Sequence, residues 1–330
     1  MYFRKGAIFL LLPLLLIQLN RNSNTNYASY ALWISLITAL GYAGSKIWGL
    51  GIDNWYGQRI ESFWDVGRWS EVLGYSIAVL VPLTLEQTSN KRRKMALTGT
   101  LILALAFLIF SGGRGPFLAL MVSCSLYLLY RKPSLLVAVA IVCSLFLYKT
   151  KELPQVHAVT ERIVSIADLH NNDSNNARLA IWSQGAAFSL SLLQESPHTF
   201  LLGTGIEQFE GLFTEFLQKS TNIELLLAST NNQFSFKDLH NTYLDLAVKL
   251  GAIYSLFFIV LLVVILISFC KNAAPTSPWG YSGACLMLTY FVNSMFYTSG
   301  LEYQTTIFFL IIALCHTQLN QDTVKSTANV

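Results

Sequence analysis

Charged residues are scarce in this chain of 330 residues. Only 12% are Asp, Glu, Lys or Arg, whereas a soluble domain carries about 25%. Apolar residues make up 53% of the chain, and the mean hydropathy is +0.48. This deficit of charge argues against a soluble fold and favours a membrane protein, because each span needs roughly 20 apolar residues. The alternating pattern of an outer-membrane barrel is also missing, so the spans should be helices.

Metal-binding patterns are missing as well. The chain has 5 cysteines (124, 143, 270, 285 and 315), all in or at the ends of apolar runs and none in a CxxC pair. Free cysteines in such runs usually serve as small packing residues. The 5 histidines (157, 170, 198, 240 and 316) are scattered along the sequence. We therefore expect neither a thiolate nor a histidine metal site, and no nucleic-acid partner.

The apolar runs predict an all-α, polytopic membrane bundle of about nine helices. The N-terminal stretch resembles a secretory signal, but no small-residue cleavage site follows, so it is interpreted as a short first span. The predicted spans are residues 6–20, 28–48, 69–85, 95–111, 116–130, 134–149, 242–269, 279–298 and 303–318.

Lys and Arg in short loops predict the orientation, because such loops face the cytoplasm. KRRK at 91–94 and RK at 131–132 are two spans apart and should both lie inside. Residues 1–149 would then hold six helices, 150–241 one large helical periplasmic loop, and 242–330 three helices and a cytoplasmic tail. Asp and Glu outnumber Lys and Arg in this loop, in agreement with the assignment.

The same count puts the N-terminus outside, which leaves Arg4 and Lys5 on the unexpected side. Two explanations remain open. Either the first segment is not a true span, or about three spans precede residue 1 in a complete version of the protein.

Two arginine sites are expected on the outer face. Arg114 stands between Gly113 and Gly115 in SGGRGP, where one span ends and the next begins. Glycines allow close backbone approach to a ligand, and an arginine fork suits phosphate. Arg68, at the start of another span, could be a further phosphate contact. The alternative for Arg114 is an arginine that reaches the lipid headgroups.

A third arginine, Arg178, follows the polar run NNDSNN at 171–176, which is typical of a loop. Arg178 should open an interfacial helix with an apolar stripe formed by Leu179, Trp182, Ala186 and Leu190. A solvated arginine on such a helix is the plain alternative to a phosphate ligand.

The stretch DLHNTYLDLAVKLGAIY, residues 238–254, places His240 at a helix start, with Asp238 or Asn241 as its cap. The positive end of a helix dipole disfavours imidazolium, and a neutral imidazole can act as a general base. A polar residue at the membrane surface is the alternative. On one continuous helix, His240 would share a face with Tyr243, Ala247, Gly251 and Tyr254, and Gly251 would serve helix packing with Ala247.

These motifs resemble the O-antigen ligase family, which is related to O-antigen polymerases. The family motif is His, then Asn, Ser or Gln, nine residues, Gly, two residues, then Gly, Thr or Tyr. His240, Asn241, Gly251 and Tyr254 match it fully. The family also has an arginine that opens an earlier span, matched by Gly113-Arg114-Gly115, and a second loop arginine, matched by Arg178.

The resemblance implies an inverting glycosyltransferase in lipopolysaccharide assembly. It would move a glycan from undecaprenyl pyrophosphate to lipid A–core at the periplasmic face of the bacterial inner membrane. His240, Arg114 and Arg178 would be catalytic, and Asn241, Arg68 and Tyr254 would contact substrate. Gly113, Gly115 and Gly251 would be structural, and neither metal nor ATP would be needed.

Two alternatives remain. Polymerases share the loop architecture and the arginines, so the acceptor is not fixed by these motifs. A transporter of lipid-linked glycans would also need arginines, but it should carry ionisable residues deep in its spans. Membrane lipids are expected contacts in every case.

Overall fold

The computed structural model describes residues 24–51, 58–86, 90–150, 173–298 and 303–328, with scattered single residues between these ranges (15, 18, 19, 54, 55, 157, 160 and 161). These residues form an all-α fold, and the extended pairing found among them is an isolated bridge between Ala274 and Ser277. The helices are α3 (Asn24–Leu50), α4 (Val66–Glu86), α5 (Lys91–Ser111), α6 (Arg114–Arg131), α7 (Pro133–Thr150), α9 (Asp173–Glu195), α10 (Pro197–Leu202), α11 (Phe209–Ser220), α12 (Ile223–Ser229), α13 (Thr242–Lys249), α14 (Ala252–Lys271), α15 (Pro278–Asn293) and α16 (Tyr303–Ala328).

The prediction that the chain is all-α is confirmed, and most predicted segments coincide with a helix. The segment at 6–20 falls almost wholly outside the described residues. The continuous helix predicted at 242–269 is wrong, because α13 ends at Lys249 and α14 begins at Ala252. Among the described helices, α5 and α14 are long and apolar enough to cross a membrane, and Pro133–Lys149 is apolar but shorter.

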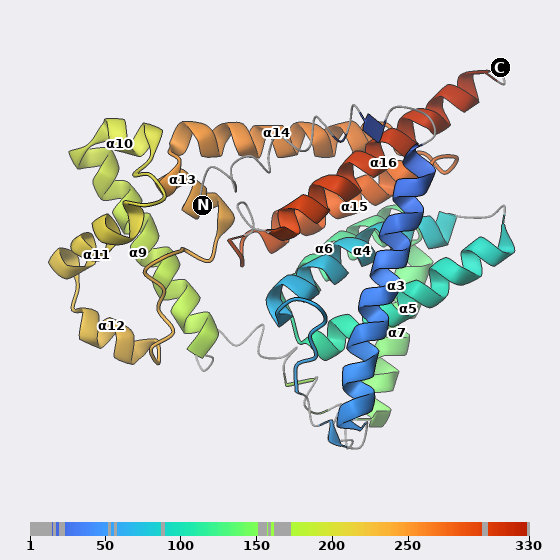
Figure 1. The fold of residues 1–330 in the computed structure, drawn as a ribbon, viewed down its shortest axis with the longest axis horizontal. Coiled ribbons are helices and arrows are strands. Elements are labelled where there is room, and N and C mark those ends of the chain that lie inside the picture. The colour runs from blue at the N-terminus through green and yellow to red at the C-terminus, as the bar shows by residue number, and fades with distance from the viewer. Residues whose placement is uncertain are drawn as a thin grey trace. The chain divides into compact units, whose positions relative to one another are not determined.

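The chain divides into two compact units (Figure 1). Of the ranges that the structure describes, unit 1 holds residues 173–264 and 294–298, and unit 2 holds residues 24–51, 58–86, 90–150, 265–293 and 303–328. One boundary between the units falls inside α14 and another at the end of α15. The division predicted at residues 150 and 242 concerned the two sides of a membrane, and it stays a prediction.

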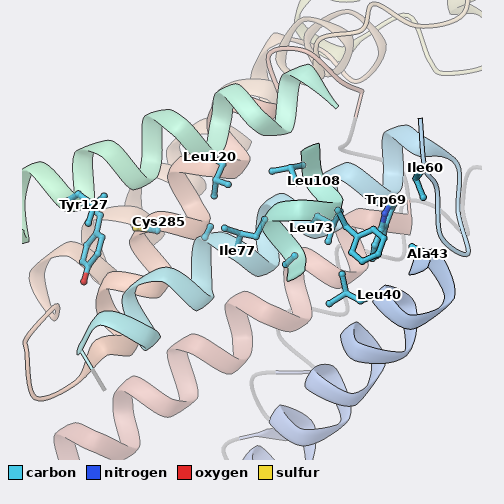
Figure 2. Close-up of a cluster of buried hydrophobic side chains, with 14 of the residues drawn as sticks. Leu40, Ala43, Ile60, Trp69, Leu73, Ile77, Leu108, Leu120, Tyr127 and Cys285 are labelled. Carbon is cyan, nitrogen blue, oxygen red and sulfur yellow. The ribbon is translucent and has the colours of Figure 1, made fainter. Parts of the chain in front are cut away.

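Unit 2 is built around α4, which packs against α5, α6, α15 and α16. Buried residues lie on every side of α4, as expected for a helix surrounded by other helices. The core is contributed by five helices and a loop (Figure 2), with Leu40, Ala43, Ile60, Trp69, Leu73, Ile77, Leu108, Leu120, Tyr127 and Cys285 among its residues. Burial of these side chains is the main source of stability for unit 2.

A polar cluster is buried in the same bundle. The carboxylate of Glu71 accepts hydrogen bonds from Asn293 Nδ2 at 2.8 Å, Gln304 Nε2 at 3.2 Å and the Tyr75 hydroxyl at 3.2 Å. Glu71 is only 1% exposed, so these contacts replace the water that it loses. They tie α4 to α15 and α16 at residues far apart in the sequence.

Unit 1 has a separate core beneath α9. Figure 1 shows α10, α11 and α12 gathered around this helix, and each of them contacts it. The ring of Phe188 on α9 lies 5.4 Å from that of Phe213 and 5.2 Å from that of Phe216, between ring centroids. Leu239 joins this cluster and is fully buried. The chain just before His240 is thus anchored in the core of unit 1.

Candidate active site

The His240 motif begins with a capped helix. Asn241 has an extended backbone, and its side-chain oxygen accepts from the backbone N–H groups of Tyr243 and Leu244, each at 3.1 Å. Asparagine is among the best residues for this role. Asn241, one of the two caps predicted, is therefore the N-cap of α13, whereas its predicted contact with substrate stays a prediction.

His240 lies before the helix, in a left-handed conformation with φ +46°. Few residues other than glycine adopt such a φ. The predicted shared face from His240 to Tyr254 is therefore wrong, because α13 starts at Thr242 and stops at Lys249. The turn is held by two carboxylates: Asp238 Oδ1 accepts from the His240 N–H and Asp245 Oδ1 from the Leu239 N–H, both at 3.1 Å.

The side chain of His240 is paired with that of Asp238. His240 Nδ1 lies 2.8 Å from Asp238 Oδ1, and the two side chains are 41% and 34% exposed. Burial favours the neutral acid at Asp238, but the hydrogen bonds and charge of His240 outweigh it and lower the pKa of this carboxyl. Asp238 was predicted only as a possible cap, although its spacing of two residues from His240 was the available signal.

A second segment of the chain, residues 294–298, also holds this turn by hydrogen bonds. The backbone carbonyl of Ser294 accepts from the Thr242 N–H at 2.8 Å, and that of Tyr297 accepts from the Thr242 hydroxyl at 2.6 Å. The Thr298 hydroxyl lies 3.4 Å from Asp238 Oδ1. No pattern in the sequence indicated this segment as part of the site.

Arg178 lies on the same side of unit 1 as this segment. Its guanidinium is 5.7 Å from the centre of the Tyr297 ring. One turn further along α9, Trp182 donates its indole N–H to the carbonyl of His240 at 3.4 Å and packs on Phe296. Arg178, through Tyr297, and the His240 turn, through Thr242, thus both contact residues 294–298. That they form a common catalytic site stays a prediction.

One detail of the Arg178 helix was predicted wrongly. The helix begins at Asp173, so Arg178 lies one turn inside it, and the acidic first residue favours this earlier start. The face buried in unit 1 consists of Ala177, Ile181, Gly185 and Phe188. Leu179 and Leu190 of the predicted stripe are exposed, and the place of this stripe at a membrane interface stays a prediction.

Gly251 ends the motif by a close backbone contact. Its φ is +94°, and an added Cβ would collide with the carbonyl oxygen of Leu201. Gly203, at φ +90°, packs against the chain from Lys249 to Gly251 in the same way. The N–H groups of Thr204 and Gly205 donate to the carbonyls of Val248 and Lys249 at 2.9 and 3.0 Å.

The predicted role of Gly251 in helix–helix packing with Ala247 is therefore wrong. Gly251 stands in the break between α13 and α14, where only a residue without Cβ fits. The nine residues between Asn241 and Gly251 are the eight residues of α13 and its C-cap, Leu250. Tyr254, the last motif position, is half-buried in the first turn of α14.

Arg114 and Arg68 belong to unit 2, where two helix starts meet. Arg114 is the first residue of α6, and an added Cβ on Gly113, its N-cap, would collide with the Ser70 side chain of α4. Glycine is therefore required at 113 for close packing, as predicted for a structural residue, and Gly115 is buried in the first turn. Arg68 is paired with Asp65 at 2.5 Å.

No group of three or more His, Cys, Asp or Glu side chains that could hold a metal ion occurs within the described ranges. The positive charges of the candidate site come from arginines.

The described residues form an all-helical protein with helices apolar enough for a membrane, and a histidine–carboxylate pair lies in the same compact unit as Arg178. Residues 99–259 match the family model described as O-antigen ligase, and this range includes Arg114, Arg178, His240 and Gly251. This match, over slightly less than half of the chain, supports the assignment to the O-antigen ligase family that the motifs predicted. This family is membrane-associated and includes related polymerases. A comparison with curated proteins found no match.

Proposed function

We propose that this protein is an inverting glycosyltransferase of the bacterial inner membrane. It would transfer an O-antigen glycan from undecaprenyl pyrophosphate to a sugar hydroxyl of lipid A–core. The observation that supports the proposal is that His240, with its carboxylate partner, and Arg178 lie in one compact unit. Trp182 of the Arg178 helix binds the carbonyl of His240, and residues 99–259 match the O-antigen ligase model.

The reaction would need one base and one source of positive charge. His240 takes the proton from the acceptor hydroxyl as the oxygen attacks the anomeric carbon of the donor sugar. The bond between that carbon and the phosphate oxygen breaks, and its electron pair leaves with the lipid pyrophosphate. Arg178 and Arg114 stabilise the negative charge that develops on this leaving group. Attack opposite the leaving group inverts the anomeric centre.

The membrane setting rests on the apolar helices. α14 exposes large apolar side chains on one side, among them Leu256, Phe257 and Val264, and α7 exposes Val142 and Leu145. Contiguous apolar surface of this kind is suited to lipid. We propose a multi-pass protein of about nine spans in this chain, with the site at the periplasmic face.

Asn241, Arg68 and Tyr254 would contact substrate in this scheme. Arg68 already has Asp65 as a partner, so a pyrophosphate would have to compete with this carboxylate. The donor is chemically activated, so the reaction needs no ATP. With arginines as the charge-stabilising groups, transfer should continue in the presence of a chelator of divalent ions.

The test uses the purified chain in detergent or vesicles, with an undecaprenyl-pyrophosphate-linked glycan as donor and lipid A–core as acceptor. Glycan on the core is the expected product. Longer glycans on the lipid carrier would instead identify a polymerase. Translocation of the donor without transfer would identify a transporter. Either of these two outcomes would overturn the ligase assignment.

A further inference from the structure

The pair formed by Asp238 and His240 is held by more hydrogen bonds than a surface ion pair requires. We propose that Asp238 is the positioning residue of His240: it keeps the proton on Nδ1, so that Nε2 is the nitrogen that accepts the proton of the acceptor hydroxyl. This inference rests on the proposed transfer reaction and assigns Asp238 a part in it.

The hydrogen-bonding chemistry gives the tautomer. A neutral imidazole has one N–H donor and one acceptor nitrogen, whereas an ionised carboxylate can only accept. With Nδ1 2.8 Å from Asp238 Oδ1, the proton belongs on Nδ1, which leaves the lone pair on Nε2. The ionised state of the carboxylate is supported by its lowered pKa. His240 is 41% exposed, so its ring is accessible to a substrate.

The carboxylate itself is held in place by several groups. Its Oδ1 accepts from the His240 backbone N–H at 3.1 Å and lies 3.4 Å from the Thr298 hydroxyl. The backbone N–H of Asp238 donates to the Ser235 hydroxyl oxygen at 3.3 Å. Leu239, between the two residues of the pair, is fully buried and donates its N–H to Asp245. Asp238 is thus a fixed acceptor, and the imidazole ring has a fixed orientation.

The left-handed backbone of His240 serves the same arrangement. With φ +46°, one oxygen of Asp238 contacts both the backbone N–H and the ring nitrogen of His240. Uncommon backbone conformations of this kind occur at functional sites, where the surroundings hold them. Here the carbonyl of His240 is bound by Trp182, and Asn241 caps the next helix.

The carboxylate would also act during proton transfer. When Nε2 takes the proton of the hydroxyl, the ring becomes an imidazolium, and the negative charge of Asp238 stabilises it without itself taking up a proton. After the glycosidic bond has formed and the pyrophosphate has left, the imidazolium gives the proton to water. The pair then returns to its starting state.

Steady-state kinetics of the purified full chain test this role, with the lipid-linked donor and lipid A–core as probes. Asp238→Ala should lower kcat by about 10²-fold or more. The KM values should change little, because Asp238 would act through His240 rather than on the substrate. Asp238→Glu should restore part of kcat. Asp238→Asn, which keeps the shape of the turn, covers the case in which Ala prevents folding, and it too should lower kcat.

A double variant separates positioning from a merely structural role. In the His240→Ala background, Asp238→Ala should cause no further loss of residual transfer, because the base through which it acts is gone. A further loss, multiplied onto that of His240→Ala, would overturn the inference and indicate a structural role. Unchanged kcat in both Asp238→Ala and Asp238→Asn would also overturn it.

A failure of the role assigned to Asp238 can be told apart from a failure of the proposed function. If the wild-type chain transfers glycan and His240→Ala does not, the function stands whatever Asp238 does. If the wild-type chain gives no transfer to lipid A–core under conditions in which a positive control enzyme does, the proposed function is overturned and the role of Asp238 with it.

Discussion

Unit 1 and unit 2 both hold carboxylates in hydrogen-bond networks, but they build these networks differently. In unit 1, the partly exposed Asp238 accepts from the N–H of His240, and Asp245, buried in α13, accepts from the N–H of Leu239, so both carboxylates bind the backbone of one turn. In unit 2, Glu71 binds Asn293 and Gln304, more than 200 residues away, in the middle of a helical bundle. The first network shapes a turn, and the second joins helices.

The two networks should therefore contribute to different properties, the first to activity and the second to stability. Groups in a partly exposed turn can meet a substrate, and their loss leaves the surrounding core in place. Groups sealed in a bundle cannot meet a substrate without a large movement, and their loss leaves buried partners without hydrogen bonds. We therefore expect substitutions in the His240 turn to act mainly on transfer, and those around Glu71 to act mainly on folding.

The largest effect is expected for His240→Ala. Removal of a positioned general base should lower transfer by about 10²- to 10⁴-fold, while the lipid-linked donor accumulates in cells. Transfer assays and thermal unfolding of the same sample would check it, and the unfolding temperature should stay close to that of the wild type. Normal ligation by this variant would show that His240 is not the base.

Glu71→Ala should have the opposite effect, a loss of stability rather than a direct loss of transfer chemistry. It leaves the amide N–H groups of Asn293 and Gln304 buried without their acceptor, and each such group costs about 1–3 kcal/mol. We expect the free energy of unfolding to fall by several kcal/mol, measured by thermal or denaturant unfolding in detergent. Glu71→Gln, which keeps one acceptor oxygen, should lose less. Equal stability of Glu71→Ala and wild type would contradict the account of the bundle.

Gly251→Ala tests whether the end of the motif is set by backbone contact. The added Cβ would meet the carbonyl of Leu201 at a positive φ, so we expect a loss of about 1–3 kcal/mol. Gly211→Ala is the matched control, because Gly211 lies in α11 with open space around its Cβ position. This control should be neutral or stabilising by up to about 1 kcal/mol, as alanine favours helix. Similar unfolding curves for both variants would refute the contact.

The smallest effect is a pH dependence of stability from Asp238. Its pKa in the folded protein lies below the usual value of about 3.9, so its contribution is present above that pH. The contribution is lost as the pH falls through the folded pKa. Wild type should therefore be more stable than Asp238→Asn at pH 6, and this advantage should shrink near pH 3. A gap that grows in acid would contradict the assigned direction.

The helices of unit 2 could be predicted from the sequence because long apolar runs leave few other choices. The break between α13 and α14 could not, since Leu250 and Gly251 continue an apolar run and one glycine is tolerated in a helix. What places the break is the contact of Gly251 with Gly203, nearly 50 residues away. The start of α9 was missed because the polar residues before Arg178 are typical of loops.

The candidate site also has parts that could be predicted from the sequence and parts that could not. His240, Arg114 and Arg178 were found because their residue types and order resemble a family motif, and their catalytic roles stay predictions. The partner of His240 was two residues away and could have been found. The contribution of residues 294–298 could not, because hydrogen bonds to the carbonyls of Ser294 and Tyr297 leave no trace in residue type.

The nine residues between Asn241 and Gly251 in the motif correspond to the length of helix α13 with its C-cap. This interval spans α13 from its cap to the glycine that docks on Gly203, about two turns of helix. One inserted residue would rotate everything beyond it by about 100° and lift it by about 1.5 Å. Substitutions within the interval are limited at its buried positions, such as Thr242, Asp245 and Val248, and a change in its length would move Gly251 and the start of α14 away from Gly203.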